Sequence, residues 1–364
     1  MIPLIRFEWY KLCKSLLVWF VLIALGIFLL TSLVEPIDRT IKSQYEKFEG
    51  TATTQIFNSI KADSEKINNN KAILGNDTIL KNRIYDHILD LQEAQIYKQQ
   101  TLKSLNMKSS KGWDYALQKS LVTRIDVSRI SYQDPAEIIA KFSNKTSILI
   151  PFLAIILLLT VSYTREHMTG VEQYQLVSIY GRKSLLFAKW FAAIGFITLI
   201  HVLTYGATIA TIRYQLGPID WSAPMQVING LTASPYPLSI GGYVLVTFFY
   251  QGLAWITLCT FVLFLSLLAK NYVQTFLYTV LFIGIPYLYG YIIPDVFFPE
   301  AIRRLVVFFP SRGVLTDEIF GDYSVLLIGG LPLLLPIVIV FFWIFLNVIL
   351  LIYMTFYVKR REIA

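Results

Sequence analysis

The chain has 364 residues, of which 55% are hydrophobic and only 15% are charged. This composition is too apolar for one or two ordinary soluble domains, so a lipid bilayer must solvate much of the chain. The net charge of +8 does not indicate nucleic-acid binding, because the basic residues do not form one stripe with aromatic residues between them.

Six runs of the sequence are apolar and long enough to cross the roughly 30 Å hydrocarbon core of a bilayer. Lysine and arginine gather at both ends of the chain and on the loops after the second and fourth runs, which places both termini in the cytoplasm. The sequence therefore predicts an all-α, multi-pass protein of the cell membrane with a large, mainly helical extracellular domain between its first two spans. The predicted transmembrane helices are 15–34, 146–163, 186–212, 239–268, 272–293 and 324–357.

The first segment, MIPLIRFEWYKLCK, mixes apolar side chains with Arg6, Lys11 and Lys14. The ring of Trp9 is amphipathic and favours the headgroup region. The pattern predicts a cytoplasmic interfacial helix over 1–14 that lies in the headgroup plane. The alternative is that these residues are only the frayed start of the first span.

The polar stretch 35–145 predicts the extracellular domain. Ile84, Ile88 and Leu91 recur at three- and four-residue steps, which is typical of a helix with one buried face. The stretch contains a single histidine, His87, and no cysteine, so its spacing indicates no metal site. We expect two or more long helices and few strands, with breaks at Gly75-Asn76-Asp77, Gly112 and Asp134-Pro135.

The loop 164–183 follows the second predicted span and has the pattern of a short amphipathic helix. Val171, Tyr174 and Tyr180 lie on its apolar side, which suits contact with a partner protein. The alternative is an ordinary cytoplasmic turn that solvent surrounds.

The segment 294–321 is too polar to span a bilayer and too apolar for a free loop. Two interpretations remain open. The segment is re-entrant and closes a path from outside, or it is a helix that lies on the bilayer surface. Under the first interpretation, the candidate extracellular gate consists of Phe297, Phe298, Arg303 and Arg304.

The motifs of common enzymes are absent from the sequence. There is no G-x-x-x-x-G-K-[ST] phosphate loop, no H-E-x-x-H and no G-x-S-x-G, and three scattered histidines with two cysteines do not form a metal centre. We therefore expect no catalytic residue, no metal and no cofactor in this chain.

Ionisable side chains are rare inside the predicted spans. His201 is the only such group away from the span ends apart from tyrosines, whereas ion-coupled carriers usually place carboxylates near the bilayer centre. Histidine and glutamine at these positions also serve simply as hydrogen-bonding contacts between helices, and aromatic residues also face lipid. Candidates for a translocation path are His201, Phe249, Gln251 and Tyr287.

Four segments in chain order carry a resemblance to a known family. RFEWYKL resembles a cytoplasmic elbow helix, with Arg6, Glu8, Trp9 and Lys11 as its polar and interfacial residues. REHMTGVEQYQLVSIYGRKSLLFAKW resembles the family pattern after span two, although Val171 replaces the usual threonine and Tyr180-Gly181 the usual Pro-Ser. SLLAKN after span four and the basic tail FYVKRREIA complete the set. Together they resemble the six-span permease subunit of ATP-binding-cassette transporters of the second exporter type.

The resemblance implies a complex of two permeases, forming a homodimer or a heterodimer, with a dimer of cytosolic ATPase subunits. ATP and magnesium would bind to the ATPase, and the loop 164–183 would dock into it and transmit its closure. The implied contact residues are Glu166, Gly170, Glu172, Tyr174, Leu176, Tyr180 and Arg182.

The function expected from the sequence is export of an amphipathic or hydrophobic substrate, such as an antimicrobial peptide, with the outer domain as a ligand-capture domain or a lid. One alternative is a membrane sensor or immunity protein that captures an extracellular peptide. A second alternative is a sodium-exporting permease of the same family, which fits poorly with the lack of carboxylates in the spans.

Overall fold

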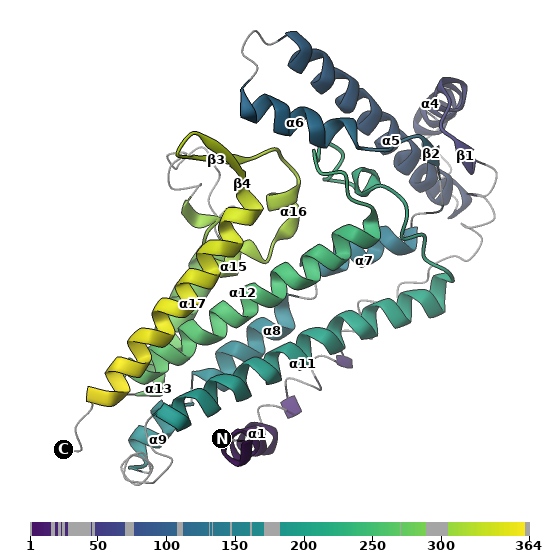
Figure 1. Ribbon diagram of the computed structural model, residues 1–364. Helices are drawn as coiled ribbons and strands as arrows, with labels where there is room; N and C mark the ends of the chain where they lie inside the picture. The colour runs from purple at the N-terminus through teal and green to yellow at the C-terminus, as the bar shows by residue number, and fades with distance from the viewer. Residues whose placement is uncertain are drawn as a thin grey trace.

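Figure 1 shows the computed structural model, which is mostly helical. It describes residues 2–15, 48–69, 76–107, 112–130, 134–145, 148–160, 162–170, 183–269, 271–288 and 305–360, with Trp19, Phe20, Ile23, Gly26, Ile27, Tyr45 and Tyr132. Long helices run side by side through the molecule, and a group of more polar helices covers one end of them (Figure 1).

Three of the described helices are long and apolar enough to cross a membrane: α11 (Lys183–Leu216), α12 (Ile240–Leu268) and α17 (Leu335–Arg360). A shorter apolar helix, α13 (Tyr272–Leu288), follows α12. This confirms the prediction of a helical protein with membrane-spanning character. The number of six spans stays a prediction, since most of 15–34 lies outside the described residues.

Helix α12 lies at the centre of the helical bundle. It packs against α11, α13 and α17 along its length (Figure 1). The side chain of Ser239 caps its first turn by accepting a hydrogen bond from the backbone N–H of Gly242, at 3.1 Å. Helix α11 ends where Gly217 takes a φ of 88°, a left-handed conformation that glycine adopts without a steric cost.

The second predicted span is helical in its described part. Helix α8 (Leu149–Ala154) leads directly into a π-helical turn (Ile155–Leu159). Such turns insert one extra residue per turn and recur at functional sites. A short helix, α9 (Thr164–Met168), follows, and Gly170 then turns the chain with a φ of 68°.

The described residues of the polar stretch 35–145, here called the polar domain, form four helices and two short paired strands. Its predicted breaks coincide with the starts of helices α5, α6 and α7, and the side chains of Ile84, Ile88 and Leu91 are buried as expected. Helices α4, α5 and α6 gather at one end of the molecule, and α7 packs against α11 and α12 (Figure 1). The elements are β1 (Gly50–Thr51), α4 (Thr54–Asn69), α5 (Asn76–Met107), α6 (Trp113–Thr123), β2 (Arg129–Ile130) and α7 (Asp134–Lys145).

The apolar run 324–357 does not form one helix. Strands β3 (Val325–Ile328) and β4 (Leu331–Leu334) pair as an antiparallel hairpin, and α17 begins only at Leu335. The turn between the strands is Gly329-Gly330, with φ angles of 60° and 83°. Two successive positive φ angles define the tight hairpin turn that matches strand twist, which explains why glycine occupies both positions.

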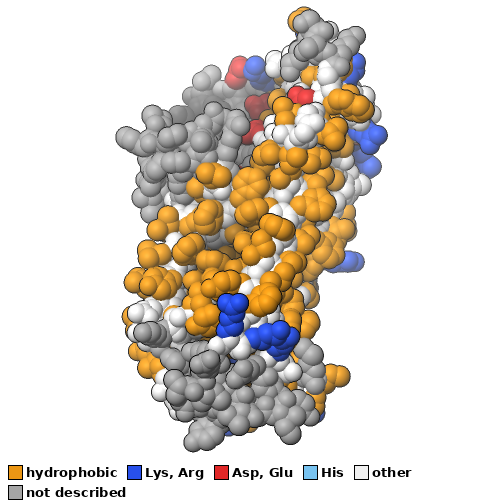
Figure 2. Space-filling model, turned by 60° about the vertical axis from the view of Figure 1, so that its left-hand side comes forward, with side chains coloured by type: hydrophobic (Ala, Val, Ile, Leu, Met, Phe, Trp, Pro, Cys, Tyr) orange, Lys and Arg blue, Asp and Glu red, His pale blue; other side chains and the backbone are white. Residues whose placement is uncertain are grey.

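Apolar side chains cover much of the outside of the helical bundle. Figure 2 shows a broad band of hydrophobic side chains across the middle of one face, with lysine and arginine side chains at its lower edge. An apolar surface of this extent requires a lipid or protein environment. Exposed apolar residues of α13 and α17 include Phe276, Phe282, Phe341, Phe345 and Ile352.

Gln251 joins α7, α11 and α12 inside the bundle. Its side-chain amide donates hydrogen bonds to the backbone carbonyls of Ser143 (2.9 Å) and Val314 (2.8 Å), and its oxygen accepts one from Tyr205 (2.8 Å). Replacing Gln251 with leucine leaves these three groups without that partner. We expect a loss of about 1–2 kcal/mol in the free energy of unfolding, measured by denaturation in detergent micelles. The control is Gly252→Ala at the neighbouring position, because no atom lies within 4 Å of a Cβ added there.

Candidate functional site

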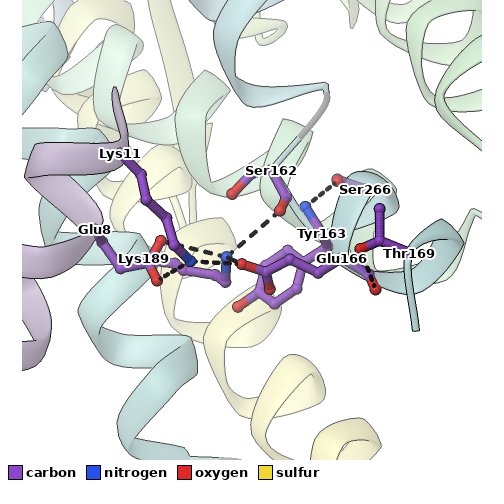
Figure 3. A network of polar contacts seen from close by, with 8 residues as sticks. All are labelled: Glu8, Lys11, Ser162, Tyr163, Glu166, Thr169, Lys189 and Ser266. Atoms are coloured by element: carbon purple, nitrogen blue, oxygen red, sulfur yellow. Dashed lines mark hydrogen bonds and ion pairs between the residues drawn. The ribbon is translucent and has the colours of Figure 1, made fainter. Parts of the chain in front are cut away.

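A network of four charged side chains, of which Glu8 and Lys189 are buried and Lys11 is about one third exposed, lies at the end of the helical bundle opposite the polar domain (Figures 1 and 3). Helix α1 (Ile2–Lys14) provides Glu8 and Lys11, α9 provides Glu166, and α11 provides Lys189. Lys11 Nζ lies 2.8 Å from Glu8 Oε1 and 2.8 Å from Glu166 Oε1. Lys189 Nζ lies 2.8 Å from Glu166 Oε1 and 3.4 Å from Glu8 Oε2.

The two lysines and the two glutamates balance each other's charge. The side chain of Lys189 is 2% exposed, and its ammonium also donates to the carbonyl of Ser162 at 3.4 Å and lies over the ring of Tyr163. Removing charges from water is costly, so such a network persists only when each charge has close partners. Here each ammonium contacts both carboxylates.

The pKa values within the network follow its geometry. Burial alone would raise the pKa of Glu166, but the charges and hydrogen bonds of Lys189 and Lys11 outweigh burial and lower it. Burial alone would lower the pKa of Lys11, and the hydrogen bonds and charges of Glu166 and Glu8 raise it instead. Both groups are therefore ionised at neutral pH.

Helix α1 presents one face to α11 because of its residue spacing. Glu8 and Lys11 are three residues apart, which places them on the same side of the helix. Beside them, the indole of Trp9 packs edge-on against Phe196 and covers Gly195 of α11, where a Cβ would lie only 3.2 Å from the indole. The small residue at 195 thus allows α1 to approach α11 closely.

A second set of contacts links the end of the second predicted span to the end of α12. The hydroxyl of Ser266 donates to the carbonyl of Thr160 at 3.4 Å and accepts from the backbone N–H of Tyr163 at 3.1 Å. Tyr163 lies next to Ser162, which accepts from Lys189. Helices α1, α9, α11 and α12 therefore meet at one junction (Figure 3).

The structure brings part of the predicted site together. Glu8, Trp9 and Lys11 of the predicted elbow all face α11, whereas Arg6 is exposed. Glu166 points inward to the two lysines. Gly170 turns the chain after α9. The other contact residues, Glu172, Tyr174, Leu176, Tyr180 and Arg182, lie outside the described residues, as do the predicted gate residues Phe297, Phe298, Arg303 and Arg304.

The four predicted path residues have different surroundings. His201 is buried, and its ring stacks on the ring of Phe248. Its Nε2 donates a hydrogen bond to the backbone carbonyl of Phe248 at 3.1 Å. Gln251 is buried between α7, α11 and α12, and Tyr287 packs against Phe152. Phe249 is 65% exposed on the outside of the described bundle. His201 and Gln251 thus each form hydrogen bonds to a neighbouring helix, and their place on a translocation path stays a prediction.

One further cluster of functional groups was missed by sequence reasoning. The imidazole of His87 on α5 lies between Asp134 and Glu137 of α7, with Nδ1 3.0 Å from Asp134 Oδ1 and Nε2 2.6 Å from Glu137 Oε2. The hydroxyl of Tyr45 lies 3.1 Å from Nδ1. The spacing of Asp134 and Glu137 on one face of α7 was visible in the sequence, but nothing in it placed α7 beside His87.

Comparisons with protein-family models, with curated proteins and with solved structures find no match. The fold is mostly helical, and its three long apolar helices indicate a membrane protein that also has a polar helical domain.

Proposed function

We propose that this chain is the membrane subunit of an exporter, energised by a separate ATPase that docks on the segment after the second span. The observation that carries the proposal is the network of Glu8, Lys11, Glu166 and Lys189. It connects a surface helix and the start of that segment directly to the base of α11.

The network gives a physical route for a force applied at this segment. A flexible connection would absorb the movement of a docked subunit. Here Glu166 is held by two ammonium groups, and Lys189 lies on a helix that continues to Leu216. A displacement of α9 would therefore move α11 as a rigid body, the type of shear that alternately closes and opens a path between helices.

The substrate class follows from the chemistry of the membrane helices. Helices α11, α12, α13 and α17 contain no aspartate or glutamate. A path between them would lack the carboxylates that sodium transport usually needs, and it would suit an amphipathic or hydrophobic substrate such as a peptide. For the polar domain we propose ligand capture or a lid over the exit.

The proposal is tested by purification with its natural partners. Full-length protein extracted in mild detergent is expected to retain an ATP-binding subunit, and Tyr174→Asp with Tyr180→Asp is expected to reduce that retention about tenfold or more, since buried aromatic residues dominate most interfaces. The amount of bound subunit is measured by quantitative mass spectrometry.

The control is Tyr214→Asp at the far end of α11, where the side chain is 84% exposed. This variant is expected to retain the subunit. Equal retention in all variants would overturn the docking site, and absence of any ATPase from the wild-type complex would favour a sensor or immunity protein, which needs none.

A further inference from the structure

The hairpin of β3 and β4 has one face that consists only of exposed aliphatic side chains. In a strand pair, alternate residues and their cross-strand partners point to the same face. The register pairs Leu326 with Leu333 and Ile328 with Leu331, so these four side chains share a face, here called the free face. Each of them is between 37% and 56% exposed. The hairpin therefore presents an apolar surface that the rest of the chain does not cover.

The opposite face of the hairpin packs against the protein. Val325, Pro332 and Leu334 lie on this face and are half-buried, and only Leu327 near the turn is exposed. Leu334 packs against the buried core, and β4 contacts both α17 and α6 of the polar domain. The hairpin is thus fixed to the protein on one side, and the free face points away from it.

Water is an unfavourable environment for the free face. Residues 325–346 contain no charged side chain, and Trp343, the one residue among them with a hydrogen-bonding side chain, is buried and donates to the carbonyl of Phe308. Two strands alone are only marginally stable in water, and they need an apolar layer on which to pack. The free face therefore requires an apolar neighbour from outside the chain.

The length of α17 places the hairpin at one boundary of the bilayer. As a helix, the apolar residues 335–358 rise by about 36 Å, slightly more than the roughly 30 Å of hydrocarbon. Lys359 and Arg360 follow at the end of the helix and suit the headgroups of one leaflet. The hairpin precedes Leu335 at the other end of α17, which is also the end toward the polar domain (Figure 1).

The backbone of the hairpin limits how deeply it can lie. The sheet has only two strands, so each strand has one edge without a strand partner. In hydrocarbon such an edge is costly, because nothing there bonds its N–H and C=O groups, whereas water and headgroups bond them at the bilayer surface. The backbone therefore belongs at the level of the headgroups, and only the side chains can reach the acyl chains.

We propose that the free face rests on the lipid leaflet on the side of the polar domain, with its four side chains among the upper acyl chains and its backbone at the headgroups. Lipid is the occupant because the free face continues into the outer surface of α17, where Ile337 and Phe341 are 46% and 67% exposed. The face also offers no charged or hydrogen-bonding side chain by which a protein partner would be selected.

Contact with lipid at this point holds the polar domain near the bilayer. The hydroxyl of Tyr323, two residues before β3, donates to Asp114 Oδ1 of α6 at 2.7 Å, and β4 contacts the same helix. Helix α6 is therefore attached to an element that lies on the leaflet. This inference does not rest on the proposed transport function.

The test measures the depth of a fluorescent label on the free face, in full-length protein reconstituted into phosphatidylcholine vesicles. Leu331→Cys is made together with Cys13→Ser, because Cys13 is exposed whereas Cys259 is buried, and is labelled with nitrobenzoxadiazole. The label is expected to lose most fluorescence to lipids with a nitroxide near the headgroup, and less to lipids with a nitroxide at the chain end or to iodide in water. Ile328→Cys, on the same face, is expected to give the same order.

Two controls in the same background mark the limits of the scale. A label at Ser59→Cys, exposed on α4, is expected to lose fluorescence to iodide alone. A label at Phe345→Cys, 63% exposed near the middle of α17, is expected to lose most to the chain-end nitroxide. The proposal is overturned if the labels at Leu331→Cys and Ile328→Cys respond only to iodide, which places the face in water, or to no quencher, which places it under another protein. Strongest loss to the chain-end nitroxide also overturns it, because the hairpin then lies within the hydrocarbon.

Discussion

Replacing Lys189 with methionine is expected to lower the free energy of unfolding by about 3–5 kcal/mol. The methionine side chain has a similar length and fills much of the same space, but it removes one of two positive charges. Glu8 and Glu166 then share Lys11 alone, and one buried negative charge is left without compensation. The measurement is chemical denaturation in detergent micelles, followed by circular dichroism.

Two further variants distinguish the effect of the lost charge at Lys189 from a general effect of substituting a lysine in α11. Lys183→Met removes an exposed lysine from the first turn of the same helix and is expected to change stability by less than about 0.5 kcal/mol. Adding Glu166→Gln to Lys189→Met restores neutrality, so the double variant is expected to be more stable than the sum of the two single effects predicts. If Lys189→Met and Lys183→Met behave alike, the network does not stabilise the junction.

The long membrane helices could be predicted because their apolar runs have the length of a membrane span. The runs 186–212, 239–268 and 272–293 keep this length although glycines and Pro286 interrupt them, and the structure forms α11, α12 and α13 within a few residues of these limits. The helix starts in the polar domain were predictable for the opposite reason, since Gly112 and Asp134-Pro135 interrupt the helical pattern locally.

The hairpin before α17 shows where apolarity alone is insufficient. Leu326, Leu327 and Leu333 are as apolar as the helix that follows, and the period of a short apolar run does not distinguish strand from helix. The signal was the pair Gly329-Gly330, which weakens a helix and favours a tight turn. The prediction of one helix over 324–357 depended on apolarity alone and did not use this pair.

The two charged clusters were predictable only in part, because each depends on contacts between distant segments. The family resemblance drew attention to Glu8, Lys11 and Glu166 one by one, but it did not show that Lys11 contacts Glu166 across 155 positions of sequence. His87 had no such resemblance to support it. Local sequence patterns determine helices, whereas the partners of a buried charge depend on how those helices pack.

Substituting Gly313 by alanine is expected to destabilise the protein by about 3 kcal/mol, at the upper end of the usual cost of overpacking. A Cβ at this position would overlap Cζ2 of Trp343 and lie 2.5 Å from its Cη2. The indole has little freedom to move aside. It is fully buried, donates from Nε1 to the carbonyl of Phe308 at 2.8 Å and packs on the ring of Tyr250.

The expected loss of stability comes from the overlap between a Cβ at 313 and the indole of Trp343, so a smaller side chain at 343 should remove this overlap. Trp343→Leu alone is expected to destabilise the protein by leaving a cavity. Combined with Gly313→Ala, it is expected to cost less than the sum of the two single changes, as measured by denaturation followed by circular dichroism. Gly206→Ala in α11, where no atom lies within 4 Å of the added Cβ, is the control and is expected to be neutral or slightly stabilising. Additive losses in the double variant would show that the indole moves aside and that segment 305–313 does not rely on this packing.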